Sequence, residues 1–330
     1  MFFKSFTAFH LVDYKTSVED LEKEMQNNLF KECGKFDEYS AGWVPAFGDD
    51  DSVMTRNANG CTLVAIKIEE RKVKSSALKA ELEKASKDEF NKRVAAGVEN
   101  PKLSKTEIME LKESIHQRML QELPKSMSNY SLQYAYIDPQ MNMLFIDGTS
   151  AKRCDGMIGM IRSATDCKVY PAQTQDDMSE VMSGWLKGNL TINPDEGLLV
   201  GEGCTLRSEY EKSSTIKYKK QNLDDNYLRG HLKDGHVVAD VELTWVDKMN
   251  FTLTESFQVK GVRLDSTLKA ALADQTEGYD DSDLEIAYFD AGFALMSEEY
   301  RSLVPLIAKE FGGFDPVENR LEEEVVPFEE

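Results

Sequence analysis

The sequence contains few of the residues that proteins use to hold metal ions or to form disulfides. Its 330 residues include five cysteines and four histidines, and no two cysteines have CxxC spacing. An odd number of scattered cysteines is typical of free, buried thiols in a reducing compartment. We therefore expect no zinc site and no disulfide framework among Cys33, Cys61, Cys154, Cys167 and Cys204.

Long hydrophobic runs are absent as well. No apolar stretch approaches the ~18 residues that a membrane span needs, and residues 2–14 indicate a first strand rather than a signal peptide. Hydrophobic residues nevertheless make up 41% of the chain, which is enough to bury a sizeable core. We expect a cytoplasmic protein without a membrane partner.

Motifs of catalysis are also missing. The chain has no GxSxG sequence, and Ser150 in DGTSAKR is typical of a helix N-cap. Gly201 and Gly203 form a bare GxG with no following GK[ST], which favours a bulge or turn over a phosphate-binding loop. The aspartates at 138, 147, 240 and 247 lack a distinctive nuclease spacing. We predict no catalytic residue, no cofactor and no enzyme activity, with a metal-dependent nuclease as the alternative.

Positive charge is scarce overall and unevenly placed. The 39 Lys and Arg residues face 59 Asp and Glu residues, a formal net charge of −20. The net charge is −5 over residues 1–50, +3 over 51–130, −2 over 131–222 and −16 over 223–330. Because the charges are segregated, the whole-chain value says little about partners.

Helical and strand patterns mix along the chain without a regular βαβ rhythm, which predicts an α+β fold with antiparallel sheets. Residues 130–138 and 141–149 indicate a β-hairpin, and residues 236–265 indicate a three-strand meander. Residues 41–48, with Pro45, indicate a loop. An acidic loop at 277–283 precedes a last helix predicted from Ser297, and Pro305 would kink that helix.

Two successive helices are predicted between residues 75 and 123, separated by Gly97 and Pro101. Ser76 is the expected cap of the first helix. Ser104 and Glu107 form a capping box at the second. On the second helix, five apolar residues recur at helical spacing and are expected to form a buried stripe: Ile108, Leu111, Ile115, Met119 and Leu123. The outer faces of the two helices are rich in Lys and Glu, which favours a helical hairpin that projects from the body of the protein.

The elements suggest five segments: an N-terminal α+β region (1–74), the helical hairpin (75–129), a central α+β region (130–222), a C-terminal α+β region (223–314) and an acidic tail (315–330). The composition of the tail is typical of disorder.

Lysines gather in one strand-like stretch, TIKYKKQN at residues 215–222. On a strand over 214–222, Lys217 and Lys219 would face one side and Tyr218 and Lys220 the other. Lysines can also simply protect an edge strand from aggregation. Further basic residues are Lys125 and the pair Lys152 and Arg153. That pair lies in the first turn of a predicted helix, where positive charge is unfavourable because it opposes the helix dipole. We therefore expect these two residues to have a role other than stabilising the helix.

Eight segments occur along the chain in a particular order and spacing: FKSFTAFHL, GWVPAFG, ANGCTLVAIKIEERKV, LPKSMSNYS, DGTSAKR, KYKKQNL, DGHVVADVELTW and FDAGFALMSEE. Together they resemble the RdgC family of recombination-associated proteins, and the resemblance extends from about residue 2 to residue 313. No single one of them is decisive.

The resemblance implies a horseshoe-shaped protomer. Two protomers would join head to head and tail to tail into a ring that encircles double-stranded DNA without sequence preference. Such a ring would restrain strand exchange by RecA through competition for DNA, and the protein would associate with the nucleoid. The family was once labelled an exonuclease.

The resemblance also implies particular DNA-binding residues. The family's Lys-Lys-Gln stretch matches Lys219, Lys220 and Gln221, beside Lys217, and its basic-aromatic segment matches residues 125–130. Its Ser-Ala-Lys-Lys helix start matches residues 150–153. Met127 and His236 depart from the family, which tends to have an aromatic residue and a lysine there, so DNA gripping is expected to be weaker or compensated.

A ring with a basic lining and an acidic exterior would reconcile the lysines with the net charge. An alternative remains in which the acidic last third, 223–330, imitates nucleic acid and binds a recombinase directly.

Overall fold

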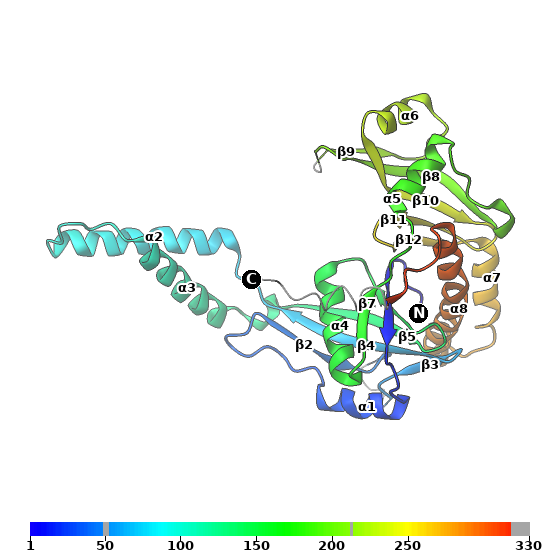
Figure 1. The fold of residues 1–330 in the computed structure, drawn as a ribbon. Helices are drawn as coiled ribbons and strands as arrows, with labels where there is room; N and C mark the ends of the chain where they lie inside the picture. Colours follow the sequence, from blue (N-terminus) through cyan, green and yellow to red (C-terminus); the bar gives the residue numbers. More distant parts are fainter. Residues whose placement is uncertain (49–52, 212–213, 318–330) are drawn as a thin grey trace. The chain divides into compact units, whose positions relative to one another are not determined.

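The computed structural model describes residues 1–48, 53–211 and 214–317 (Figure 1). They form two compact units that interleave along the chain. The first unit comprises residues 1–25, 45–65 and the chain from Gln133 onward, and the second comprises residues 26–44 and 66–132. The expected mixture of helices and antiparallel strands is confirmed, with eight α-helices among the described residues. The five expected domain segments are not tested by this division and stay a prediction, and residues 318–330 of the tail lie outside the described part.

The second unit holds a three-strand sheet in the order β2-β4-β5. Its strands are β2 (Tyr39–Val44) and parts of β4 (Cys61–Glu70) and β5 (Asn129–Asp138). The loop expected at 41–48 is wrong over its first half, because β2 occupies residues 41–44. The glycine at 42 makes this strand possible, since a Cβ there would lie 2.3 Å from the Phe30 backbone. Trp43 is buried and exchanges backbone hydrogen bonds with Asn28 and Phe30.

Two long helices complete the second unit, α2 (Ser75–Ala95) and α3 (Lys105–Glu122), followed by the short 3-10 helix η1 (Lys125–Met127). The capping box at Ser104 and Glu107 is confirmed. The Ser76 cap is wrong, because α2 begins at Ser75 after Lys74, whose side chain makes no capping hydrogen bond. Ion pairs connect the helices, with Arg93 at 2.6 Å from Glu107 and Arg118 at 3.1 Å from Glu81.

The two helices bury little. No residue of α2 is buried, and of the stripe expected on α3 only Ile115 is buried, with Ile108 39% exposed.

The first unit is built on an antiparallel sheet in the order β5-β6-β1-β12-β11-β10-β8-β9, with β3 (Arg56–Ala58) beside β4 and β7 (Lys168–Pro171) beside β1. The remaining strands are β1 (Phe6–Val12), β6 (Met143–Asp147), β8 (Leu198–Ser208), β9 (Thr215–Tyr218), β10 (His236–Trp245), β11 (Met249–Thr254) and β12 (Gln258–Leu264). The expected hairpin is confirmed by the pairing of Asp138 with Met143, and the expected meander is confirmed by β10, β11 and β12.

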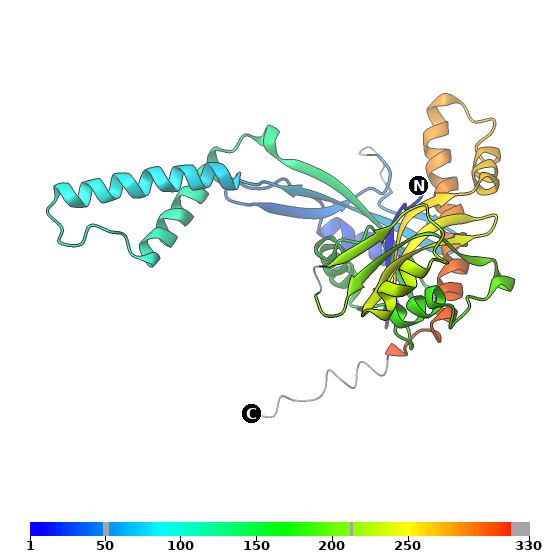
Figure 2. The same ribbon diagram turned by 90° about the horizontal axis from the view of Figure 1, so that it is seen from above.

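The helices and short 3-10 helix of the first unit are α4 (Ala151–Thr165), α5 (Met178–Lys187), η2 (Pro194–Glu196), α6 (Asn226–Lys233), α7 (Ser266–Asp274) and α8 (Asp281–Glu310). Helix α1 (Val18–Asn27) ends in the second unit. Helix α5 packs against β10, where Ser179 and Ser183 bond the backbone of Val238 (Figure 1). Helices α7 and α8 lie side by side (Figure 2).

An aromatic cluster forms the centre of this unit. The rings of Tyr136 and Phe145 stack at 4.5 Å, and the rings of Phe6 and Tyr300 lie 4.4 Å apart. The hydroxyl of Tyr300 donates to the carbonyl of Phe3, which gives this buried phenol a partner.

The end of the described chain differs from the expectation. A single helix of 30 residues, α8, begins within the last three residues of the acidic loop expected at 277–283 and continues through Ser297, where the last helix was expected to begin. Ser297 resembles a cap in sequence because two glutamates follow it. In the structure its hydroxyl donates to the carbonyl of Ala294 inside the helix. Pro305 lies within α8 as expected.

Candidate nucleic-acid interface

The lysine-rich stretch lies at one end of the sheet of the first unit. Strand β9 pairs with β8 alone in the strand order, from Arg207 opposite Thr215 to Cys204 opposite Tyr218. The strand expected over 214–222 is too long, because β9 ends at Tyr218 and Lys220 has a left-handed φ of 51°. The alternation expected for Lys219 and Lys220 therefore does not hold. The backbone turns there, and the amide of Gln221 donates to the carbonyl of Glu202.

This turn brings all three lysines into one hollow of about 570 Å³, here called the basic hollow. It is lined by Cys204, Lys217, Tyr218, Lys219, Lys220, Asp240, Glu242, Thr252, Lys260 and Arg263, together with two glycines. On β10, Val241 and Leu243 are fully buried, whereas Asp240 and Glu242 line the hollow. Because side chains alternate along a strand, the hollow occupies the face of the sheet opposite to the buried one.

Two cations of the basic hollow, Lys260 and Arg263 on β12, were missed by the sequence reasoning. Residues 260 and 263 would face opposite sides of a regular strand. In the structure, Asn250 pairs with Arg263 and Thr252 with Lys260, so two steps along β11 match three along β12. The extra residue is a bulge at Gly261, where φ is 61°. A glycine inside an alternating strand was the signal that could have revealed it.

A second bulge shapes the neighbouring strand. Val241 pairs with Cys204 and Leu243 with Val200, so β8 carries extra residues around the GxG sequence. The predicted bulge is confirmed. A Cβ at Gly201 or Gly203 would lie 3.0–3.1 Å from the Glu242 side chain, so both positions favour glycine.

Cations outnumber carboxylates in the basic hollow by five to two. Arg263 forms an ion pair with Glu242. Among the described residues, Lys217, Lys219, Lys220 and Lys260 have no ion-pair partner. Burial raises the pKa of the Cys204 thiol to about 12, with the charge of Asp240 adding to the effect. The hollow thus offers unneutralised positive charge but no activated thiol.

Lys125 lies in the second unit and is already paired. Its ammonium group is 2.6 Å from Glu32, and this hydrogen bond raises the pKa of Lys125. Nearby, the carboxylate of Glu69 accepts hydrogen bonds from the Cys33 amide and the Tyr130 hydroxyl. Lys125 would have to leave Glu32 before it could bind another anion.

Lys152 and Arg153 lie exposed in the first turn of α4 and do not line the basic hollow. Ser150 is the N-cap residue as predicted, but its side chain makes no capping hydrogen bond. Burial raises the pKa of the Asp147 carboxyl, and the charge of Arg153 opposes that shift. The charge of Arg153 therefore favours the ionised form of a half-buried acid.

Gly159 of the same helix has open surroundings, since a Cβ there would meet nothing within 4 Å.

Comparison with known proteins decides the family. The family model described as "Putative exonuclease, RdgC" matches residues 1–314. The chain belongs to the RdgC family. Recombination-associated protein RdgC of Psychromonas ingrahamii is 30% identical over 95% of this chain and 99% of its own length. The RdgC proteins of Tolumonas auensis and Salmonella typhimurium are 27% and 26% identical over 95% of this chain, and 99% and 98% of their own lengths are covered.

The exonuclease in the RdgC family description would need groups that hold catalytic metal ions. In residues 1–48, 53–211 and 214–317, no three His, Cys, Asp or Glu side chains gather as a possible metal site. Asp138, one of the four aspartates considered from the sequence, forms an ion pair with Arg301 at 2.8 Å and accepts from the turn amides of Gln140 and Met141. In the same ranges, no helix has both the length and the hydropathy to cross a membrane.

Proposed function

We propose that this RdgC protein binds double-stranded DNA without sequence preference and thereby restrains RecA-dependent recombination. The observation that carries the proposal is the basic hollow, where Lys217, Lys219 and Lys220 meet Lys260 and Arg263 in a chain whose net charge is −20. The proposed protein is a nucleoid-associated binding protein of the cytoplasm and has no enzymatic step.

Phosphate recognition explains the absence of sequence preference. Ammonium groups bind phosphate oxygens, which are the same at every base pair, and each phosphate contact releases condensed counterions. The logarithm of affinity should therefore fall linearly with the logarithm of salt concentration, with a slope of about −0.9 per phosphate contacted.

The proposed assembly is a homodimeric ring of horseshoe-shaped protomers, with α2 and α3 as a projecting hairpin. The poor burial of these helices supports a contact with a second copy. No residue of α2 is buried, and Met109 of α3 is 72% exposed. A twofold contact between hairpins would bury the exposed apolar side chains of α3, among them Ile108 and Met109, and would supply packing that these helices lack within one protomer.

The test replaces two lysines of the basic hollow. Lys219→Glu with Lys220→Glu should lower affinity for duplexes of unrelated sequence by a common factor, on the order of tenfold or more, and should make the salt slope shallower by about two contacts. Fluorescence anisotropy at several salt concentrations measures both quantities. Lys15→Glu with Lys168→Glu is the matched control, because it makes the same charge change at exposed lysines outside the hollow that have no ion-pair partner among the described residues. Equal affinities for the two double variants would overturn the assignment of the site.

The exonuclease named in the family description is the rival function. Incubation of end-labelled duplex with the protein and Mg²⁺ or Mn²⁺ distinguishes the two functions. Shortened products that scale with protein concentration would establish the nuclease, and intact duplex at high protein concentration would support the binding function.

A further inference from the structure

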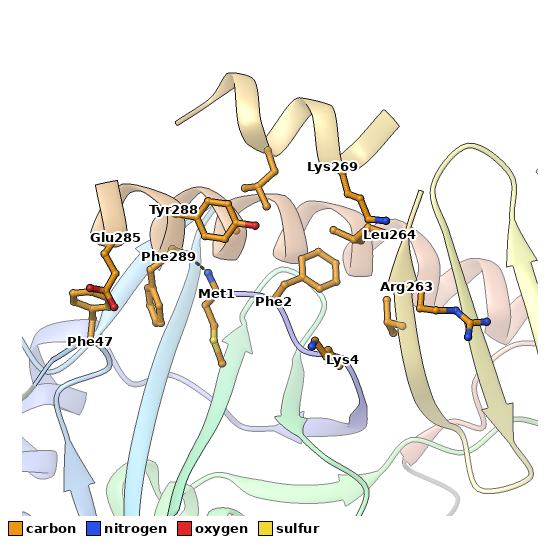
Figure 3. Close-up of a pocket in the computed structure, with 13 residues that line it drawn as sticks. Met1, Phe2, Lys4, Phe47, Arg263, Leu264, Lys269, Glu285, Tyr288 and Phe289 are labelled. Carbon is orange, nitrogen blue, oxygen red and sulfur yellow. Dashed lines mark hydrogen bonds between the residues drawn. The ribbon is translucent and has the colours of Figure 1, made fainter. Parts of the chain in front are cut away.

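A second cavity lies away from β9, between the first residues of the chain, α7 and the start of α8. Its volume is about 700 Å³ and its walls are mainly apolar, formed by Phe2, Phe47, Leu264, Leu272, Tyr288 and Phe289 (Figure 3). Tyr288 is 53% exposed, and the rings of Phe47 and Phe289 meet edge to face at 4.9 Å. We call this cavity the aromatic pocket. A pocket of this size can hold an aromatic side chain with its neighbours.

The charges of the aromatic pocket are separated. Lys4, Lys269 and Arg263 lie toward the β12 and α7 side, whereas Glu285 lies beside Phe47 (Figure 3). Burial lowers the pKa of the Met1 amino group to about 5, and this group donates to the carbonyl of Phe289. It is therefore neutral at pH 7. Arg263 is paired with Glu242, so among the described residues Lys4 and Lys269 carry the unneutralised positive charge of the pocket. The pocket suits an apolar group followed by carboxylates.

The chain itself contains such a segment outside the described residues. Residues 318–330 are ENRLEEEVVPFEE, with six glutamates against one arginine. Within them, Val325, Val326, Pro327 and Phe328 form a short apolar run, and Glu329 and Glu330 follow directly. The order of chemical groups, aromatic and then acidic, matches the aromatic pocket with its cationic side.

The length of this segment allows it to reach the pocket of its own chain. The ring of Phe314 lies 4.8 Å from the ring of His10. The nine residues from His10 back to Met1, at the pocket wall, span at most ~32 Å. The fourteen residues from Phe314 to Phe328 span up to ~50 Å when extended. The tail is therefore long enough even for the largest separation that β1 permits.

We propose that Phe328 of the C-terminal segment docks into the aromatic pocket of the same chain, with Glu329 and Glu330 beside Lys269 and Lys4. Tethering supports this docking, because a short flexible linker gives its end an effective concentration on the order of millimolar. A segment that binds only weakly as a free peptide is thus largely bound when attached. The inference concerns a site other than the basic hollow and does not depend on DNA binding.

The test is competition between the attached segment and a free one. A fluorescein-labelled peptide of residues 318–330 is titrated with the full-length protein, and anisotropy reports its binding. In the wild-type chain the attached segment occupies the pocket, so the peptide binds poorly. Phe328→Ala in the full-length protein should raise peptide affinity at least about fivefold, because the competitor is weakened. Leu321→Ala, which removes an apolar side chain elsewhere in the segment, is the matched control and should resemble the wild type.

A second substitution locates the peptide. Lys269 is exposed on α7, so Lys269→Glu in the Phe328→Ala background should leave the melting temperature unchanged and abolish the gain in affinity. Equal peptide affinity for wild type and Phe328→Ala, or a gain that survives Lys269→Glu, would overturn the proposal. Sedimentation of the full-length proteins distinguishes the source of the segment. If Phe328→Ala lost self-association that the wild type shows, the occupant would come from a second copy, and the assignment to the same chain would be wrong.

Discussion

Individual cations of this protein differ in whether a carboxylate already neutralises them. Lys125 is held by Glu32, and Arg263 is held by Glu242. Lys219 and Lys220 have no such partner among the described residues. A paired cation must lose its carboxylate before it can bind phosphate, so a lysine count overstates the binding surface. The contribution of each residue therefore depends on its neighbours.

The ion pair of Glu107 gives a pH-dependent prediction. Hydrogen bonds from Arg93 and from Ser104 lower the pKa of Glu107 from 4.5 to about 2. Because the folded pKa is depressed, the pair stabilises the protein above about pH 4.5, and this stabilisation is lost as the pH falls toward 2. Glu107→Gln should therefore lower the melting temperature relative to wild type at pH 6, and the difference should vanish toward pH 2.

Thermal melts followed by circular dichroism from pH 2 to pH 7 measure that difference. Glu110→Gln is the control, since Glu110 is an exposed glutamate of the same helix without an ion pair among the described residues. A difference for Glu107→Gln that stayed constant with pH would contradict the assigned pair.

At the level of strands and helices, regular patterns were predictable and interruptions of them were not. The hairpin at 130–149 follows from two strand-like runs on either side of Pro139 and Gln140, and the meander at 236–265 follows from alternation. Strand β2 escaped prediction because Pro45 suggests a loop, although Gly42 permits close contact of the strand with Phe30. Helix α8 was divided wrongly because Ser297 with two glutamates imitates an N-cap.

Only part of the basic hollow was predictable from the sequence, because a bulge interrupts the regular strand pattern of β12. The lysines of 217–220 are visible as a cluster in the sequence. Lys260 and Arg263 join them only because the bulge at Gly261 changes which face each residue occupies. Gly261 signals a bulge in the sequence, but tertiary pairing fixes the register that places the two cations beside the lysines of β9.

Two glycines with open surroundings test this account of the bulge. A Cβ at Gly261 or at Gly159 would meet nothing within 4 Å, but only Gly261 has a positive φ, 61°. Gly261→Ala should lower the free energy of unfolding by about 1–2 kcal/mol, the cost of a left-handed conformation for a residue with a Cβ. Gly159→Ala, inside α4, should raise it by about 0.5–1 kcal/mol. Urea unfolding measures both, and effects of equal sign would contradict the bulge geometry.

For the whole molecule, charge is divided between a locally basic surface and an acidic remainder. The last third of the chain, 223–330, has a net charge of −16, yet it contributes Lys260 and Arg263 to the basic hollow. Acidic surface elsewhere repels DNA and leaves fewer places for it to bind. Under the proposed function, this division would favour one defined mode of DNA binding over coating of the surface.

The proposed ring leads to a prediction about DNA topology. A closed ring can thread onto the end of a linear duplex, but it must open to load onto a covalently closed circle. We expect binding at equal length and salt to be at least about tenfold faster for linear duplex than for relaxed closed circles. Stopped-flow fluorescence with labelled protein measures the rates, and cutting the circle once should restore the linear rate. Equal rates for both forms would contradict threading.

Arg263 lines both the basic hollow and the aromatic pocket. Its guanidinium already pairs with Glu242 and cannot also pair with an anion in each cavity. Anionic occupants of the two cavities would therefore compete for Arg263. Thermodynamic linkage would make such competition reciprocal: an occupant of one cavity that engages Arg263 would change the affinity of the other cavity by the same factor in both directions. Competition for this one side chain would couple the occupancies of the two cavities without any movement of the sheet.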